Sequence, residues 1–244
     1  SVLPICRGAR HTVKRLWAVV PAAGAGLRLG GDIPKQYREV AGAPLMEHTL
    51  RALLQSPDIG GVVVAMDPAD PRADTIASLS DERVQTTPGG VTRAHSVLAG
   101  LDALEDQIGE GDWALVHDAA RPCLTGDALA ALIDRARVLG EGVILAEPVA
   151  DTLKQVTAQG VIEKTVDRSI LWRAQTPQLF PLLSLRDALR HCIEQGVSVT
   201  DEAMAMERAG QPVHIVEGAS SNIKVTVEAD LVFADVFLKE AEDR

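Results

Sequence analysis

Short apolar runs alternate with stretches of helical periodicity along most of the chain. The runs predict buried strands over 16–20, 61–66, 83–86, 113–117 and 142–146. Between them, apolar positions recur at helical spacing and predict helices over 44–56, 71–79, 97–104 and 127–139. This βαβα order predicts an α/β, Rossmann-like fold, in which a mostly parallel sheet is covered by helices on both faces.

The pattern changes at about Val149, and from Asp151 to Val166 polar and apolar residues alternate. Two short strands on either side of Gln159-Gly160 are predicted to pair as a β-hairpin. One compact sheet cannot cover both faces of such a ribbon, so we expect residues 149–167 to project as an arm and to pack on a second copy. A surface flap is the alternative. Beyond the arm, the pattern predicts helices over 183–195, 201–208 and 227–241 and a strand over 213–216.

The composition is that of a globular protein. Of the 244 residues, 46% are apolar and 24% are charged, which indicates a single domain of α/β size over residues 16–244. Residues 1–15 carry basic side chains and no acid, and no apolar segment of a signal peptide follows them. We therefore expect a flexible N-terminal tail.

Charge and cysteine usage exclude several classes of protein. The net charge of −10 argues against a general nucleic-acid binder, so an anionic substrate requires a local basic pocket. Cys6, Cys123 and Cys192 show no CxxC spacing, which favours free thiols in a reducing cytoplasm. No apolar stretch of about 18 residues is present, so no membrane span is predicted.

The most informative segment is a loop of small residues that directly follows the first predicted strand. It runs from Pro21 to Gly31 and is soon followed by Pro34-Lys35-Gln36. Small residues let backbone N–H groups approach phosphate oxygens closely, and Arg28 and Lys35 add two cations. This combination predicts a loop that binds a triphosphate.

The glycine spacing Gly24-x-Gly26-x-x-x-Gly30 is also close to a dinucleotide fingerprint. A dinucleotide loop, however, runs straight into a helix, whereas Gly30-Gly31 and Pro34 disfavour a helix here. The next predicted strand ends near Asp67, too far along for the acid that binds the ribose of such a cofactor. A nicotinamide-dependent oxidoreductase is thus disfavoured, and a non-catalytic nucleotide-binding regulator is a further alternative.

Blocks beyond the loop resemble those of one family of nucleotidyltransferases. The loop reads Pro21-Ala-Ala-Gly-x-Gly-x-Arg28, with Pro34-Lys-Gln-Tyr37 downstream. The chain then carries, in order, Gly89-Gly90-x-x-Arg93-x-x-Ser96-Val97, Val116-His-Asp-Ala-Ala-Arg-Pro122, Asp151-Thr-x-Lys154, Thr165-Val-Asp-Arg168, Thr176-Pro-Gln178, Thr200-Asp-Glu-Ala203 and Asn222-Ile-Lys-Val-Thr226. Together these blocks resemble the 2-C-methyl-D-erythritol 4-phosphate cytidylyltransferases of the non-mevalonate isoprenoid pathway, from residue 16 to about 240.

The resemblance implies one reaction. A phosphate oxygen of methylerythritol phosphate attacks the α-phosphorus of CTP, and pyrophosphate leaves. Because negative charge spreads over the phosphoryl oxygens, fixed cations supply most of the catalysis. The catalytic residues implied are Arg28 and Lys35, over the CTP phosphates, and Arg168 and Lys224, on the attacking phosphate. Magnesium is the expected counter-ion of the triphosphate.

The same resemblance implies that small residues line the nucleotide, namely Ala22, Ala23, Gly24, Gly26, Gly90 and Ala119. Ser96 is implied to contact the cytidine, with an ordinary helix-face hydroxyl as the alternative. Asp118 follows a predicted central strand, at the rim where ligands bind in open α/β sheets. We expect Asp118 near the metal, directly or through water, and a cap of the next turn is the alternative.

The methylerythritol phosphate subsite is implied to contain Arg121, Thr152, Arg168, Thr176, Thr200 and Lys224. Guanidinium groups suit this subsite because they can bond two phosphate oxygens in one plane. Thr152 and Arg168 flank the predicted hairpin, which in the family reaches the neighbouring subunit. A homodimer whose active site is shared across the interface is therefore expected.

Three positions depart from the family pattern. Leu27 replaces a common second arginine, and Val91 and His95 replace frequent acids. We therefore expect the affinity for CTP to be lower, unless a backbone contact replaces the lost side chain. A cytidylyltransferase for another polyol phosphate, such as ribitol phosphate, is the alternative function. His117 is expected to be a structural histidine, and the other histidines lack the spacing of a zinc site.

Overall fold

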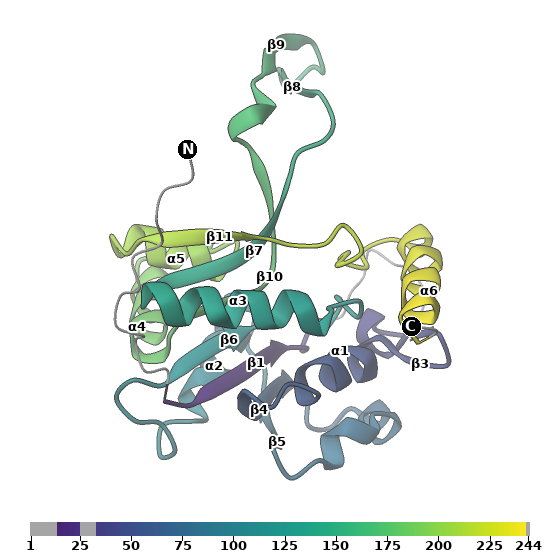
Figure 1. The fold of residues 1–244 in the computed structure, drawn as a ribbon, viewed down its shortest axis with the longest axis vertical. Helices are drawn as coiled ribbons and strands as arrows, with labels where there is room; N and C mark the ends of the chain where they lie inside the picture. Colours follow the sequence, from purple (N-terminus) through teal and green to yellow (C-terminus); the bar gives the residue numbers. More distant parts are fainter. Residues whose placement is uncertain (1–13, 25–32, 243–244) are drawn as a thin grey trace.

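A seven-stranded sheet with helices on both faces dominates the computed structural model, which describes residues 14–24 and 33–242 (Figure 1). Its strand order is β11-β7-β10-β6-β1-β4-β5. Strand β10 runs antiparallel to both of its neighbours, and the other neighbouring pairs are parallel. The predicted α/β fold with a mostly parallel sheet is confirmed.

The elements follow the predicted order closely. The strands of the main sheet are β1 (Leu16–Pro21), β4 (Ile59–Met66), β5 (Val84–Pro88), β6 (Trp113–Val116), β7 (Gly142–Pro148), β10 (Trp172–Pro181) and β11 (Val213–Glu217). The helices are α1 (Leu45–Leu54), α2 (Arg93–Asp102), α3 (Gly126–Leu139), α4 (Leu182–Glu194), α5 (Glu202–Arg208) and α6 (Glu228–Glu242). Strands β2 (Glu39–Val40) and β3 (Ala43–Pro44) form a short separate hairpin.

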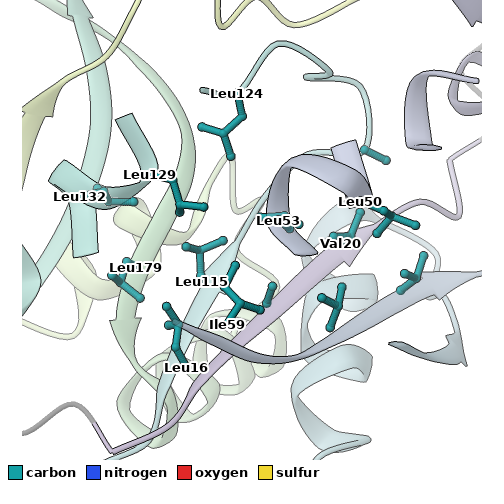
Figure 2. Close-up of a cluster of buried hydrophobic side chains, with 14 of the residues drawn as sticks. Leu16, Val20, Leu50, Leu53, Ile59, Leu115, Leu124, Leu129, Leu132 and Leu179 are labelled. Carbon is teal, nitrogen blue, oxygen red and sulfur yellow. The ribbon is translucent and has the colours of Figure 1, made fainter. Parts of the chain in front are cut away.

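Strand β1 is buried on both sides, as a central parallel strand must be. Leu16 and Val20 belong to a core cluster with side chains of α1 and α3, part of which Figure 2 shows. Trp17 and Val19 point to the opposite face, where they join side chains of α2, α4 and α5. The period of two along the strand thus builds two cores, one on each face of the sheet.

The predicted hairpin is present and projects from the body, at the top of Figure 1. Its strands, β8 (Leu153–Val156) and β9 (Ile162–Val166), pair only with each other and are almost wholly exposed. Gly160, in the turn, has a φ of +80°, a left-handed conformation that favours glycine. The expected arm therefore exists in the isolated chain.

Two segments differ from the prediction. Residues 71–79, predicted as one helix, form two short 3₁₀ turns, because Ile76 between them is extended. Strand β10 was not predicted, since its buried half carries Gln175, Thr176 and Gln178, with Pro177 at a break in the ladder register. Those polar side chains are bonded to distant partners, so the strand lacks the apolar alternation that marks a half-buried strand.

The two ends of the described chain are attached to the body. Lys14 and Arg15, the last residues of the expected tail, form backbone hydrogen bonds with Gly111 and Trp113. Residues 1–13 of that tail lie outside the described residues. Near the other end, α6 packs through Ala234 in a small cluster that also contains Val225. Within the described ranges, no helix is both long and apolar enough to cross a membrane.

Candidate active site

A cleft of about 310 Å³ opens where the chain leaves the carboxyl ends of β1 and β6. Parallel strands end at the same edge of a sheet, which is where ligands bind in open α/β folds. Among the residues that line the cleft are nine that the sequence singled out: Ala22, Ala23, Gly24, Lys35, Gly90, Ser96, Asp118, Ala119 and Lys224. Segments spread over 200 positions of the chain thus meet at one place.

Lys35 is held at the cleft by Gln36, its neighbour in the sequence. The two residues begin a 3₁₀ turn, Lys35–Tyr37, in which Gln36 is buried. The Gln36 side-chain amide donates to the carbonyl oxygen of Ala22 at 2.8 Å. This bond ties the turn that carries Lys35 to the loop that follows β1.

The loop over 89–92 forms another wall. The Ser96 hydroxyl accepts from the Gly90 N–H at 3.0 Å and donates to the Thr92 carbonyl at 3.1 Å, so it holds this loop on α2. A Cβ at Gly89 would lie 2.1 Å from the Ala23 Cβ, which is closer than such atoms can approach. Glycine at this position therefore lets the two loops touch.

Asp118 lies at the floor of the cleft and joins three cations. Its Oδ1 accepts from Arg93 Nε at 2.8 Å, and its Oδ2 lies 2.8 Å from Lys224 Nζ and 3.8 Å from Arg121 Nε. Burial by itself raises the pKa of this carboxyl, but the Arg93 guanidinium and then the Lys224 ammonium hold the pKa well below its usual range. Asp118 is therefore a permanent anion among positive groups.

Two residues of this cluster, Arg93 and Glu202, were given no role by the sequence reasoning. Arg93 donates through Nη1 and Nη2 to both carboxylate oxygens of Glu202, at 2.6 and 3.0 Å. Both residues stand in blocks that carry the family resemblance, and that is the signal that could have pointed to them. Their pairing joins positions 109 apart, which no local pattern reveals.

His117 and Thr176 lie beneath Asp118. The carbonyl of Arg121 can only accept, so His117 Nε2 donates to it and Nδ1 accepts from the Thr176 hydroxyl at 2.8 Å. The same hydroxyl accepts from the Asp118 N–H at 3.0 Å. Burial lowers the pKa of His117 to about 4, so the ring is neutral at pH 7 and structural, as expected. Thr176, implied for the acceptor subsite, is buried and already engaged by these two bonds.

A second cleft of about 320 Å³ adjoins the first and shares Lys224 with it. Arg121 and Arg173 also line it, together with the carboxylates of Asp230 and Glu147, and Glu147 accepts from Arg173 Nη2 at 2.8 Å. The Arg121 guanidinium is anchored by donation from Nη1 to the Asn222 carbonyl at 2.6 Å. Two residues implied for the acceptor subsite, Arg121 and Lys224, thus lie together in this cleft.

Other predicted site residues lie elsewhere. Thr152 and Arg168 are exposed at the base of the arm, where Arg168 Nη1 donates to the Ala150 carbonyl, and neither residue lines the two clefts. Thr200 is exposed just before α5 and also lies outside both linings. Gly26 and Arg28 lie outside the described residues.

Of the three departures from the family pattern, Val91 lines the first cleft and His95 does not. Val91 is 90% exposed and lines the cleft, while the His95 ring is hydrogen-bonded to the Thr92 hydroxyl. Leu27 lies outside the described residues. No group of three or more His, Cys, Asp and Glu side chains in the described ranges is arranged to hold a metal ion.

Comparison with known proteins identifies the family. The family model for 2-C-methyl-D-erythritol 4-phosphate cytidylyltransferase matches residues 16–240. The chain is 47% identical to the protein of that name from Vibrio vulnificus strain CMCP6, over 96% of this chain and 99% of that one. It is 49% identical to the protein of that name from Ectopseudomonas mendocina, over 90% of this chain and 94% of that one.

Solved structures agree with the sequence relatives. The structure of 2-C-methyl-D-erythritol 4-phosphate cytidylyltransferase from Francisella tularensis is similar to this chain with a TM-score of 0.79 and 34% identity, covering 92% of this chain and 100% of that one. The fold, the matched residues and the shared sequence all lead to the same conclusion. The chain belongs to the 2-C-methyl-D-erythritol 4-phosphate cytidylyltransferase family.

Proposed function

We propose that this protein transfers the cytidylyl group of CTP to 2-C-methyl-D-erythritol 4-phosphate, in isoprenoid precursor biosynthesis. The products are 4-diphosphocytidyl-2-C-methyl-D-erythritol and pyrophosphate. One observation carries the proposal: the small residues that follow β1 and Lys35 meet Lys224 in a cleft, and Lys224 also lines a second cleft with Arg121 and Arg173. The first has the dimensions of a small-molecule site, and together they offer two adjoining places for two anionic substrates.

In this proposal CTP occupies the first cleft, with its phosphates towards Lys35. The acceptor phosphate lies where the clefts join, between Lys224 and Arg121. One of its oxygens attacks the α-phosphorus, the bond to the bridging oxygen of pyrophosphate breaks, and the electron pair leaves with pyrophosphate. The cations offset the repulsion between the two anions and the charge that develops on the phosphoryl oxygens. Arg28, on the same loop as Ala22 and Gly24, is proposed to act beside Lys35.

Magnesium is proposed to enter as part of the substrate, on the phosphates of CTP. Both oxygens of Asp118 already accept from cations, Oδ1 from Arg93 and Oδ2 from Lys224. Asp118 is also the only carboxylate among the described residues that line the first cleft. We therefore propose that Asp118 contacts the metal through water.

We further propose that residues 16–244 act as one cytidylyltransferase unit that forms a homodimer through the arm over 149–167. Arg168 and Thr152 lie at the base of the arm and line neither cleft of their own chain. Val161 and Ile162, near the arm's tip, are more than half exposed, which an isolated chain has no reason to maintain. A second copy would cover them and receive Arg168 in its acceptor subsite. A cytoplasmic location remains a prediction from the sequence.

The test is an acceptor screen. Purified protein is incubated with CTP, Mg²⁺ and, in turn, methylerythritol phosphate, ribitol 5-phosphate and erythritol 4-phosphate, and pyrophosphate release is followed. The proposal predicts the highest kcat/KM with methylerythritol phosphate. Faster release with ribitol 5-phosphate would assign the alternative acceptor, and binding of NADPH without CTP-dependent release would support the oxidoreductase.

A further inference from the structure

We propose that Glu202 is a positioning residue of the transfer reaction, which acts through Arg93 and Asp118 on Lys224. The inference rests on the function proposed above and adds a residue to its machinery. Glu202 does not line either cleft, so it has no path to a substrate of its own. Among the residues that the structure describes, its side chain bonds to the two terminal nitrogens of Arg93.

Glu202 is a fully buried carboxylate. Its side chain is 0% exposed, at the first position of α5. The preceding Asp201 already caps this helix by accepting from the Met204 N–H. A helix needs no second cap, and a fully buried carboxylate is costly unless it is paired. The bidentate bond to Arg93 is therefore what Glu202 is placed to make.

Arg93 is held through all three of its nitrogens. Nη1 and Nη2 each donate one bond to Glu202, and Nε donates to Asp118 at 2.8 Å. A planar guanidinium that bridges two carboxylates can neither rotate nor translate without breaking one of the bonds, and a lysine could not make the same bridge. Glu202 thus fixes the plane of Arg93 and, through Nε, the position of the Asp118 carboxylate.

The charges of Arg93 and Lys224 are both balanced by Asp118. Within the first cleft, one Asp118 oxygen pairs with Arg93 and the other with Lys224, at 2.8 Å each. Since Glu202 neutralises Arg93, the guanidinium does not draw Asp118 away from Lys224, and it does not itself offer a free charge to the triphosphate. The cluster thereby keeps Lys224 at the junction of the two clefts, where the attacking phosphate must be held.

The experiment compares Glu202→Gln, Glu202→Asp and, as a control on the exposed side of the same helix, Glu207→Gln, with thermal unfolding measured for each. Misplacing a reacting group by about 1 Å can cost about 100-fold, so Glu202→Gln should lower kcat about 100-fold and leave the KM for CTP within about threefold. Glu202→Asp keeps the charge but is one methylene shorter, and should lower kcat about tenfold. The control should match the wild type.

A structural role alone would lower the melting temperature and leave kcat per folded molecule unchanged, and that result in Glu202→Gln overturns the proposal. If Glu202→Gln does not fold, the Asp variant decides, because it retains the paired charge, and a kcat within twofold of wild type then overturns it. The Arg93→Lys variant lacks the bridge, so adding Glu202→Gln to it should lower kcat by less than a further factor of about three. If Glu202→Gln lowered kcat by the same factor in this background as in the wild type, action through Arg93 would be contradicted. Pyrophosphate release by the wild type is measured in the same assay, so a wild type without activity refutes the proposed function instead.

Discussion

The first cleft and the arm carry predicted site residues in opposite ways. At the first cleft, Asp118 is almost wholly buried, and short ion pairs hold Arg93 between it and the buried Glu202 behind the cleft. On the arm, Thr152 and Arg168 are exposed, and the two strands are bonded only to each other. The nucleotide half of the proposed site is therefore preorganised within one chain, whereas the arm's contribution depends on what it meets outside.

This difference has an energetic reason. Burial removes charges from water, so each charge in the cleft must have a fixed partner, and the same partners fix its geometry. An exposed arginine such as Arg168 gains little from its surroundings, and beyond its bond to the Ala150 carbonyl it faces solvent, where another molecule can reach it. Variants that affect the two regions should consequently differ in which kinetic constant they change.

The largest effect is expected at the first cleft. Lys35→Ala should lower kcat about 1,000-fold with little change in folding, because a preorganised cation at the phosphates is lost. The measurement is pyrophosphate release at saturating CTP and acceptor, with circular dichroism to check the fold. Lys239→Ala, on exposed α6, is the matched control, and near-wild-type turnover in Lys35→Ala would show that the cleft does not bind the reacting phosphates.

A smaller and differently distributed effect is expected on the arm. Arg168→Ala should raise the KM for methylerythritol phosphate about 30-fold and the KM for CTP by less than about threefold, because one charge-assisted phosphate contact contributes about 2 kcal/mol. Lys164→Ala, on strand β9 of the arm, should leave both constants unchanged. Equal increases in both KM values would contradict the division into nucleotide and acceptor halves.

Mixing two variants tests whether the halves come from different chains. The assay uses methylerythritol phosphate far below the KM of Arg168→Ala, so that each variant alone has little activity. In a heterodimer of Lys35→Ala and Arg168→Ala subunits, one of the two shared sites has both residues intact. Random exchange at equal amounts should therefore restore about a quarter of wild-type activity, because about half of the dimers are mixed and each has one good site. No recovery after subunit exchange, verified by mass spectrometry, would mean that each site lies within one chain.

The last effect does not concern activity but the pH dependence of the free energy of unfolding. It distinguishes the buried region, which contains His117, from the arm, which contains no histidine. Burial lowers the pKa of His117 from 6.5 to about 4, so below pH 6.5 the unfolded chain binds a proton that the folded chain refuses. Stability should fall as the pH drops from 6.5 to 4, by about 3 kcal/mol from this group. Urea unfolding should show a shallower decline in His117→Gln than in wild type or in exposed His191→Gln, and identical slopes would refute the assignment.

Local patterns predicted most of the fold for a physical reason. Strand β1 and helix α3 have apolar periodicity that any compact fold must bury, so their existence is decided within a few residues of chain. The hairpin was likewise predicted from the mixed polar and apolar residues on either side of Gln159-Gly160. Strand β10 was not, because Gln178 is bonded to Asp201 and to the Ala203 N–H, partners that lie more than 20 positions away.

The candidate site divides in the same way. Nine residues named from the loop and the family resemblance do line one cleft, since small residues and strand ends have a local signature. Thr176 and Thr200 belong to the same blocks, yet the described clefts do not include them, because a block places its residues near a site without deciding which side chains face it.

The sequence by itself determined the order of most strands and helices and the hairpin of the arm, and it predicted the loop suited to phosphates, because periodicity and side-chain size act over a few neighbouring positions. Only the tertiary structure decided that Asp118 is joined to Arg93 and Lys224, that Glu202 anchors Arg93, and that Arg168 lies away from its own clefts. Buried ion pairs depend on which distant residues share a low-dielectric space. That is a property of the folded chain as a whole.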